Sequence, residues 1–375
     1  MTESSAALRF AAGSQTALMI CARAARWFLD SGIQESGGGV ARYYIASEGR
    51  NALVSTEITG YSVSSFLHLA EVLQEPDLRK AACHAANFLV SAWDEDAQAM
   101  PFEWSSDGRD FPERHSYFFD CGIIVRGLLR LWRETGAVMY LERAMQIGES
   151  MRRDFMNASD IHPIIMLPGK KPVPRDQRWS RSPGCYQLKS ALAWRELLDA
   201  TGQLRFEQAY DRALGYTMRN HAQFPFLEGD GPRVMDRLHA YCYFLEGLLP
   251  ALEKPGVEAA LREGITLTAQ LLRRLRSHFE RSDVVAQLLR LRLFSAALDV
   301  LPLDQQAAAE EASWIVLHQY QSSDEKLNGA FCFGVREGQR LPFANPVSTA
   351  FCAQAISLWQ ERLDGETDAD WRKLI

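Results

Sequence analysis

Two kinds of predicted helix alternate along this chain, and their regular alternation restricts the fold more than any other feature. Three segments repeat a pattern in which apolar or small residues stand at positions i, i+3, i+4 and i+7: residues 77–89, 140–151 and 205–217. That spacing is typical of a helix buried along one stripe. The pattern recurs at intervals of roughly 60 to 65 residues, which indicates a repeated structural unit.

Each of these amphipathic helices follows a helix that is more apolar around its circumference. The preceding segments are residues 60–73, 121–132 and 185–198. A short breaker, LQEPD, RETGA or LDATG, separates the two members of each pair. The pattern therefore predicts helical hairpins, each with an inner helix buried on several sides and an outer helix buried on one.

The same alternation extends over the rest of the chain. Further hairpins are predicted over residues 239–272 and 283–319. The last inner helix, residues 346–359, would pack against the first outer helix, residues 16–29, and so close a ring. We predict an all-α fold in which residues 1–375 form a single (α/α)6-barrel domain of six hairpins, with minor β-strands such as RYYIAS and FCFGV in the loops. An open solenoid of the same repeat is the alternative.

Composition and charge exclude several classes of protein. A net charge of −6 argues against a general nucleic-acid binder, which normally carries a basic excess. The chain shows no secretory signal, and no apolar run approaches the roughly 18 residues of a membrane span. The seven cysteines are dispersed without a CxxC pair, as in proteins of a reducing compartment. We expect a cytoplasmic protein without membrane insertion, and the sequence leaves its oligomeric state open.

The connections that lead into the inner helices are long, whereas the turns from inner to outer helix are short. Because these long loops all reach the N-terminal ends of inner helices, they should gather on one face and form a pocket. They are rich in aromatic residues, which stack on sugar rings, and in arginine, which binds carboxylates, sulfates and phosphates. We expect an anionic carbohydrate there, although loops of this length could carry such residues merely to cover the barrel. The predicted binding residues in the loops and at the helix entrances are Trp104, Arg178, Trp179, Arg181, Tyr186, Arg237, Tyr241 and Asn345.

Two carboxylates begin successive inner helices and should therefore be neighbours at the pocket. Glu57 lies in STEITGY and Asp120 in YFFDCG. Glycosidic cleavage needs such a pair, because one carboxyl group protonates the leaving oxygen while the other activates water or attacks the sugar. Helix capping is the competing interpretation for Asp120, and for Asp283 we favour it. Ser55 and Thr56 can cap the helix ahead of Glu57, which leaves the role of Glu57 open.

His239 and Tyr243 suggest a different chemistry. Either side chain could remove the proton α to a uronate carboxylate while arginine neutralises that carboxylate, as a lyase or epimerase requires. Tyr241 and Tyr243 point to different sides of a helix, so at most one of them is expected to face the pocket. No phosphate-binding glycine loop, dinucleotide fingerprint or paired zinc-ligand motif is present, and we predict neither a cofactor nor a metal.

The hairpin count, together with the motifs TEITGY, FFDCG and RSDVVAQLLRL, resembles the six-hairpin glycosidase-like superfamily. Within it, the chain is most similar to barrel proteins encoded among bacterial exopolysaccharide biosynthesis genes. That superfamily includes unsaturated-uronide hydrolases, sugar 2-epimerases and polysaccharide lyases. The resemblance implies that Asp120 is a catalytic aspartate of the barrel mouth, with Glu57 where an aspartate is expected. Sugar 2-epimerases use more than one barrel histidine, whereas here only His239 stands at a helix entrance.

These observations lead to a first hypothesis and two alternatives. The first is a glycoside hydrolase that cleaves an acidic, uronate-containing oligosaccharide or exopolysaccharide unit, with Asp120 and Glu57 as the acid and base. The second is a polysaccharide lyase or sugar epimerase that uses His239 and Tyr243. The third is a non-catalytic barrel that binds glycan in polysaccharide biosynthesis.

Overall fold

Inner and outer helices alternate along the chain in the computed structural model, which describes residues 14–104, 114–157, 160–176, 178–226, 231–367 and 369–375. Twelve α-helices fall within these ranges. The inner helices are α3 (Thr56–Leu73), α5 (Phe118–Thr135), α7 (Gln187–Thr201), α9 (Gly231–Leu248), α11 (Ser282–Ala297) and α13 (Pro346–Leu363). The outer helices are α2 (Ser14–Asp30), α4 (Pro76–Ala92), α6 (Val138–Asp154), α8 (Leu204–Asn220), α10 (Val257–Leu275) and α12 (Gln305–Leu317).

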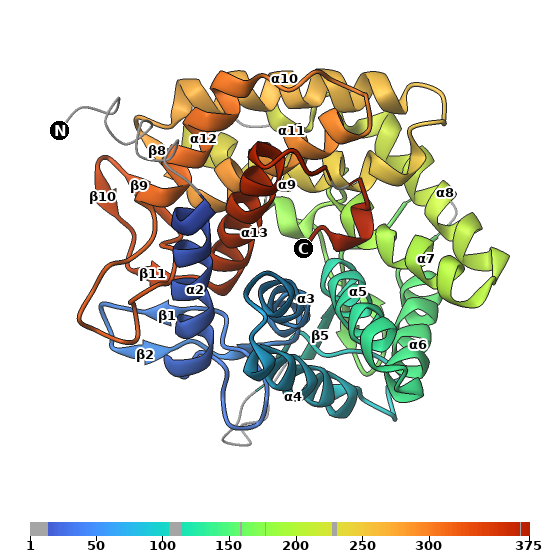
Figure 1. Ribbon diagram of the computed structural model, residues 1–375. Coiled ribbons are helices and arrows are strands. Elements are labelled where there is room, and N and C mark those ends of the chain that lie inside the picture. The colour runs from blue at the N-terminus through green and yellow to red at the C-terminus, as the bar shows by residue number, and fades with distance from the viewer. Residues whose placement is uncertain (1–13, 105–113, 158–159, 177, 227–230, 368) are drawn as a thin grey trace.

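The inner helices form a closed ring. Each inner helix packs against the next along the chain, and the last, α13, returns to contact both α3 and α2 (Figure 1). Each outer helix packs on its own inner helix, so that α4 lies on α3, α6 on α5 and α8 on α7. The predicted (α/α)6 barrel is therefore confirmed, and the open solenoid is excluded by the contact between α13 and α3.

Burial follows the two predicted patterns. The inner helix α11 is buried continuously from Ser282 to Ser295, because it has neighbours on every side. The outer helix α8 is buried only along a stripe that contains Phe206, Ala209, Tyr210 and Ala213, the positions that the periodicity predicts. Continuous burial gives an inner helix no polar face, which explains why hydrophobic content rather than periodicity distinguishes it in the sequence.

Glycine allows adjacent inner helices to approach closely. A Cβ atom at Gly127 of α5 would lie 2.6 Å from the carbonyl oxygen of Gly60 on α3. A Cβ atom at Gly122 would overlap the backbone at Ser190 on α7. Both positions lie within regular helix, so glycine serves there for close packing and not for backbone freedom.

Short strands hold the ends of the long loops. They are β1 (Tyr44–Ile45), β2 (Arg50–Asn51), β3 (Val54–Ser55), β4 (Glu103–Trp104), β5 (Arg114–Tyr117), β6 (Ile164–Leu167), β7 (Lys171–Pro172), β8 (Phe279–Arg281), β9 (Gly334–Arg336), β10 (Gln339–Arg340) and β11 (Phe343–Ala344). They pair as β11-β1-β2, β10-β9-β8, β3-β4 and β5-β6-β7. Strands β3, β5, β8 and β11 each end at or next to the start of an inner helix, so the small sheets fix the geometry at one end of the ring.

One helix boundary differs from the prediction. Helix α9 begins at Gly231, eight positions before the predicted start at His239. Pro232 follows immediately, and proline is tolerated in the first turn of a helix because its missing N–H has no intrahelical partner there. His239 therefore lies inside α9, more than two turns from its start.

The opposite end of the ring is closed by residues 371–375, of which η4 (Trp371–Lys373) is a 3-10 helix. The chain ends near the middle of the ring in Figure 1. Three buried cations of inner helices donate to main-chain oxygens of this segment: Arg126 to Leu374 at 2.8 Å, and Lys189 and Arg290 to Ile375 at 3.0 and 3.2 Å.

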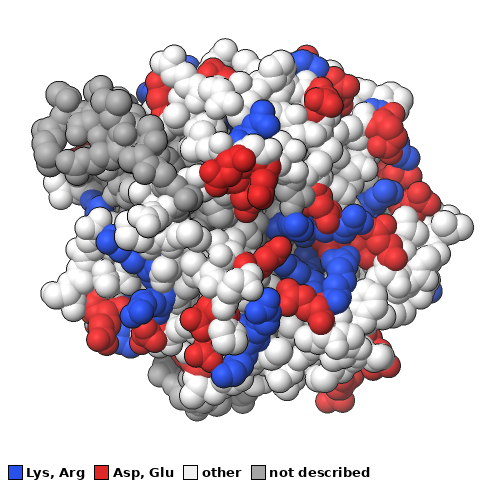
Figure 2. Space-filling view, viewed as in Figure 1, with Lys and Arg blue, Asp and Glu red and all other residues white. Residues whose placement is uncertain are grey.

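Charges of both signs meet on the face that carries this closing segment. Figure 2 shows basic and acidic side chains side by side near the middle of the face. The ion pair between Arg372 and Asp199, with a distance of 2.8 Å, is of this kind. No helix in the described ranges is both long and apolar enough to cross a membrane.

Candidate active site at the barrel mouth

The N-terminal ends of the inner helices surround one end of the ring, which we call the barrel mouth. Glu57 of α3, Asp120 of α5, His239 of α9 and Asp283 of α11 all belong to it. Neighbouring inner helices bring these side chains together from positions far apart in the sequence. The repeat predicts this convergence, because the inner helices run in the same direction around the ring.

Glu57 is free of any capping role. Ser55 is the N-cap of α3, and its hydroxyl accepts a hydrogen bond from the backbone N–H of Ile58 at 3.3 Å. Glu57 keeps some solvent access, but the surrounding protein displaces enough water to raise the pKa of its carboxyl group to about 7. The positive charge of Arg42 acts in the opposite direction. A carboxyl group with this pKa can exchange its proton near neutral pH.

Asp120 is not the helix cap. The N-cap of α5 is Tyr117, and no side chain makes a capping hydrogen bond there. Asp120 is only 5% exposed, and its Oδ2 atom has no hydrogen-bond partner in the described protein. Burial raises the pKa of its carboxyl group well above the ordinary value, and the nearby Glu57 raises it further. Asp120 is therefore suited to hold a proton, as a general acid must.

Tyr243 of α9 completes the inner wall beside this carboxyl pair. Its ring contacts Phe119 of α5, with 4.7 Å between centroids, and lies 6.3 Å from Phe351 of α13. Burial raises the pKa of its phenol well above the ordinary value, and the charge of Glu57 contributes. Tyr243 therefore keeps its proton at neutral pH, which makes it a hydrogen-bond donor and disfavours the predicted role as a base.

Arg42 is a mouth residue that the sequence did not single out. It precedes β1, and its guanidinium group pairs with Glu103 of β4 at 3.2 Å and lies over the ring of Phe102. Its charge lowers the pKa of both Glu57 and Asp120, which places it close to the carboxyl pair. Its position in RYYIAS, a predicted strand before the first inner helix, was the only available signal.

His239 lies in a buried polar network on the other side of the mouth. Its Nδ1 atom is 2.8 Å from Oε1 of Gln287 and 3.6 Å from Oδ2 of Asp283. Arg281 holds both oxygens of Asp283 at 3.0 and 2.7 Å and reaches Asp236 at 2.7 Å. The expectation that Asp283 caps its helix is wrong, since the N-cap position belongs to Arg281 and lacks a side-chain capping bond. The carboxylate instead neutralises a buried cation.

An aromatic and cationic wall lies between α7 and α9. Trp179, in the 3-10 helix η1 (Trp179–Arg181), makes an edge contact with Tyr186 at 5.1 Å and approaches the ring of His239 at 6.3 Å. Arg237 is 7% exposed and lies over the ring of Phe224, which belongs to η2 (Phe224–Phe226). Neither a carboxylate nor another hydrogen-bond acceptor binds the guanidinium group of Arg237 within the described ranges.

Two other predicted arginines are more exposed. Arg178 binds Asp176 at 2.6 Å with its side chain 65% exposed, and Arg181 lies 3.8 Å from the same carboxylate. Burial and the charge of Asp120 raise the pKa of the Tyr117 phenol, while the charges of Arg181 and Arg42 act in the opposite direction. These two guanidinium groups therefore approach Tyr117 from different loops. Tyr117 lies three residues before Asp120 in the sequence.

Three predicted binding residues lie apart from this cluster. Tyr241 stacks with His221, at 6.4 Å between centroids, on the side of α9 that faces the outer helices. This separation from Tyr243 agrees with the expectation that at most one of the two faces the pocket. The side-chain oxygen of Asn345 accepts from the N–H of Ser348 at 3.0 Å as the N-cap of α13. Trp104 lies 40% exposed on β4, against Phe88.

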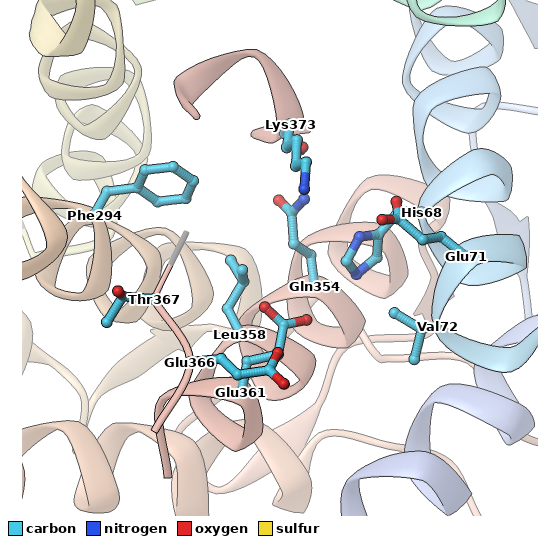
Figure 3. A pocket seen from close by; sticks show the side chains of 10 residues that line it. All are labelled: His68, Glu71, Val72, Phe294, Gln354, Leu358, Glu361, Glu366, Thr367 and Lys373. Carbon is cyan, nitrogen blue, oxygen red and sulfur yellow. The ribbon is translucent and has the colours of Figure 1, made fainter. Parts of the chain in front are cut away.

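A separate cavity of about 410 Å³ lies at the other end of the ring (Figure 3). Its walls come from the inner helices α3, α11 and α13 and include His68, Glu71, Phe294, Gln354 and Glu361. Figure 3 shows the imidazole of His68 beside the amide of Gln354. No predicted site residue lines this cavity, so it is unconnected with the carboxyl pair.

The described residues hold no group of three His, Cys, Asp or Glu side chains that could bind a metal ion. The seven cysteines are free thiols. Cys121, Cys185 and Cys242 near the mouth are all buried, and burial raises the pKa of each thiol. Buried thiols of this kind pack as small apolar side chains.

Comparison with known proteins finds solved structures that have this barrel architecture. Neither a family model nor a curated relative matches the sequence. Cellobiose 2-epimerase from Spirochaeta thermophila superposes with a TM-score of 0.72 at 16% identity, over 94% of this chain and 98% of that one. A D-mannose isomerase gives 0.71 at 9% identity, over 93% and 98%. The chain shares the (α/α)6-barrel fold of these structures.

Enzymes with different reactions share this barrel fold. An unsaturated glucuronyl hydrolase mutant from Streptococcus agalactiae superposes with a TM-score of 0.61 at 10% identity, over 96% of this chain and 92% of that one. The similar structures thus include an epimerase, an isomerase and a hydrolase. At identities this low the likeness concerns the fold, and the reaction has to be inferred from the side chains at the mouth.

Proposed function

We propose that this protein is a carbohydrate-active enzyme that cleaves a glycosidic bond, with Asp120 as general acid and Glu57 as general base or nucleophile. The observation that carries the proposal is the buried Oδ2 of Asp120, which has no hydrogen-bond partner among the described residues and lies beside Glu57. Both carboxyl groups have raised pKa values, with burial as the largest cause for each. At neutral pH the pair thus offers one proton donor and one partly ionised carboxylate, the combination that glycosidic cleavage uses.

The substrate that fits this mouth is an anionic oligosaccharide. Arg42, Arg181 and Arg237 approach the mouth from three different segments: the chain before β1, the 3-10 helix η1 and helix α9. Exposed ion pairs such as that of Arg42 with Glu103 contribute only about 0–1 kcal/mol, so a substrate carboxylate can replace Glu103 at little cost. Trp179 and Tyr186 provide aromatic surface for a sugar ring beside them.

The test is turnover of uronate-containing oligosaccharides by the full chain. Asp120→Asn and Glu57→Gln should each lower kcat/KM by about 100-fold or more, the usual contribution of general acid–base catalysis. Glu71→Gln, at the other end of the same helix as Glu57, is the matched control and should keep full activity. Equal turnover by wild type, Asp120→Asn and Glu57→Gln would overturn the assignment.

A second candidate is sugar epimerisation or isomerisation, and His239 is the observation that favours it. Burial and Arg281 lower the pKa of this imidazole to about 4, so it is neutral and can accept a proton at physiological pH. The cellobiose 2-epimerase named above belongs to this reaction class. Incorporation of solvent deuterium at a sugar carbon, without bond cleavage, would identify this reaction, whereas saturable binding without turnover would identify a glycan-binding barrel.

A further inference from the structure

Gln287 is a fully buried side chain of α11 that makes two contacts with one residue of the neighbouring helix. Its Oε1 atom lies 2.8 Å from Nδ1 of His239, and its Nε2 atom donates to the backbone carbonyl oxygen of His239 at 3.4 Å. The pair fixes the orientation of an imidazole at the barrel mouth.

The two contacts determine which nitrogen of the imidazole carries the proton. A backbone carbonyl oxygen can only accept a hydrogen bond, so the amide nitrogen of Gln287 must face it and the amide oxygen must face the ring. That amide oxygen also only accepts, and Nδ1 of His239 must therefore be the protonated ring nitrogen. In a neutral imidazole the other nitrogen, Nε2, then bears a free lone pair.

Burial, helped by the charge of Arg281, lowers the pKa of His239 and keeps the ring neutral. Asp283 and Asp236 favour the imidazolium form, but Arg281 neutralises both carboxylates and itself opposes protonation. The remaining neighbours are the ring of Tyr243, 4.5 Å away, and the ring of Trp179. In the described part of the chain, no hydrogen bond to Nε2 of His239 is found.

We propose that Gln287 is a positioning residue that holds His239 as the Nδ1–H tautomer, so that Nε2 accepts a hydrogen bond from a hydroxyl group of the sugar bound at the mouth. The identity of the bound molecule as a sugar rests on the proposed function. The tautomer and its dependence on Gln287 do not rest on it. His239 thereby supplies a neutral acceptor at the same barrel mouth as the carboxyl pair.

Nitrogen NMR of the full chain, labelled with ¹⁵N-histidine, tests the tautomer directly. His239→Asn assigns the resonances, because one set disappears. We expect a protonated Nδ1 and an unprotonated Nε2 in wild type between about pH 6 and 8. An Nε2–H tautomer, or an equal mixture of both forms, would overturn the proposal.

Two substitutions test the role of Gln287. Gln287→Glu places a carboxylate against Nδ1 and should move the His239 titration upward by at least one pH unit. Gln287→Leu removes the acceptor and should produce mixed tautomers. Gln306→Leu, on the outer helix α12, should change neither. An unaltered His239 tautomer and titration in both Gln287 variants, with circular dichroism showing that they are folded, would contradict the inference.

Titrating the protein with a sugar tests this inference independently of the proposed hydrolysis. Adding D-glucuronate or cellobiose should shift the Nε2 resonance of His239 in wild type and shift it much less in Gln287→Leu. That result supports the inference even if Asp120→Asn and Glu57→Gln leave turnover unchanged and the hydrolase assignment fails. Saturable sugar binding that leaves the Nε2 resonance unmoved would overturn it even if hydrolysis is established.

Discussion

The raised pKa of the Asp120 carboxyl group is a consequence of lost solvation. Among the influences on its carboxyl group burial is the largest, and Glu57 and Arg42 modify the result with opposite signs. Burial is also the main cause of the raised pKa of Glu57, but this carboxyl group keeps some contact with water. Two carboxyl groups on adjacent helices thus acquire different proton affinities from their surroundings, which is how one chemical group can serve as both acid and base.

Arg42 should set the acidic limb of the pH–rate profile. Its charge lowers the pKa of Glu57, which is about 7 in the folded protein. Arg42→Gln removes that charge, so the pKa of Glu57 rises and the base becomes protonated at higher pH. We expect the acidic limb of kcat/KM to move upward by about 0.5–1 pH unit, a discounted effect because Arg42 is partly exposed.

The matched variant Arg42→Lys keeps the charge and should leave the acidic limb nearly in place. It should nevertheless weaken binding of an anionic substrate, since lysine lacks the two-pronged geometry of the guanidinium group. A downward movement of the limb in Arg42→Gln would show that Arg42 does not stabilise the ionised form of Glu57.

Residues at the mouth differ in how far the sequence could identify them. Glu57 and Asp120 were predictable because each stands at the same point of a repeated hairpin. Arg42 and Gln287 were not, since each gains its role from a side chain on another segment: Glu103 for Arg42 and His239 for Gln287. No local pattern marks an arginine before a short strand or a glutamine within an apolar helix.

At the scale of single elements, close contact between helices limits which residues an inner helix can accept. Gly127→Ala would place a methyl group 2.6 Å from the carbonyl oxygen of Gly60, so α3 and α5 would have to separate. We expect the free energy of unfolding to fall by about 1–3 kcal/mol, the usual cost of overpacking. Chemical denaturation followed by circular dichroism measures this change.

Gly215→Ala is the control on an outer helix. Its new Cβ atom would have only the flexible end of Arg219 nearby, at 3.7 Å. Alanine favours helix over glycine by about 1 kcal/mol, so this variant should be slightly more stable than wild type. If both alanine variants shifted stability in the same direction, packing between α3 and α5 would not be the cause.

The small sheets are elements that the sequence only partly predicted. RYYIAS contains β1 and FCFGV contains the start of β9, as expected, but strands such as β4 and β10 are only two residues long. A two-residue strand has no periodicity to detect, and it forms because its partner is held in register by the loops. The same argument explains why the start of α9 was misplaced.

At the scale of the whole molecule, residues 371–375 close the end of the ring opposite the mouth. Arg126 is also paired with Glu196 at 2.7 Å, and Glu246 binds both Lys189 and Arg290. Burial lowers the pKa of Lys189 to about 7, which shows how little water reaches this network. The main-chain oxygens of residues 374 and 375 accept hydrogen bonds from N–H groups of these cations that the carboxylates do not bind.

Deleting residues 371–375 should therefore destabilise the whole barrel. Each buried donor left without an acceptor costs about 1–3 kcal/mol, so the free energy of unfolding should fall by several kcal/mol. Arg372→Ala, which removes the exposed ion pairs with Asp199 and Asp370, should cost at most about 1 kcal/mol. Denaturant unfolding of both variants checks this, and similar stabilities would show that the segment contributes little.

The sequence by itself determined the hairpin repeat, the closed ring and the gathering of Glu57, Asp120 and His239 near one end. These follow from the periodicity of side chains along single helices, which is a local property. The tertiary structure alone decided that Oδ2 of Asp120 lacks a hydrogen-bond partner among the described residues, that Asp283 pairs with Arg281, and that residues 371–375 fill the opposite end. Burial and charge pairing depend on side chains from distant segments, whose relative positions no local pattern records.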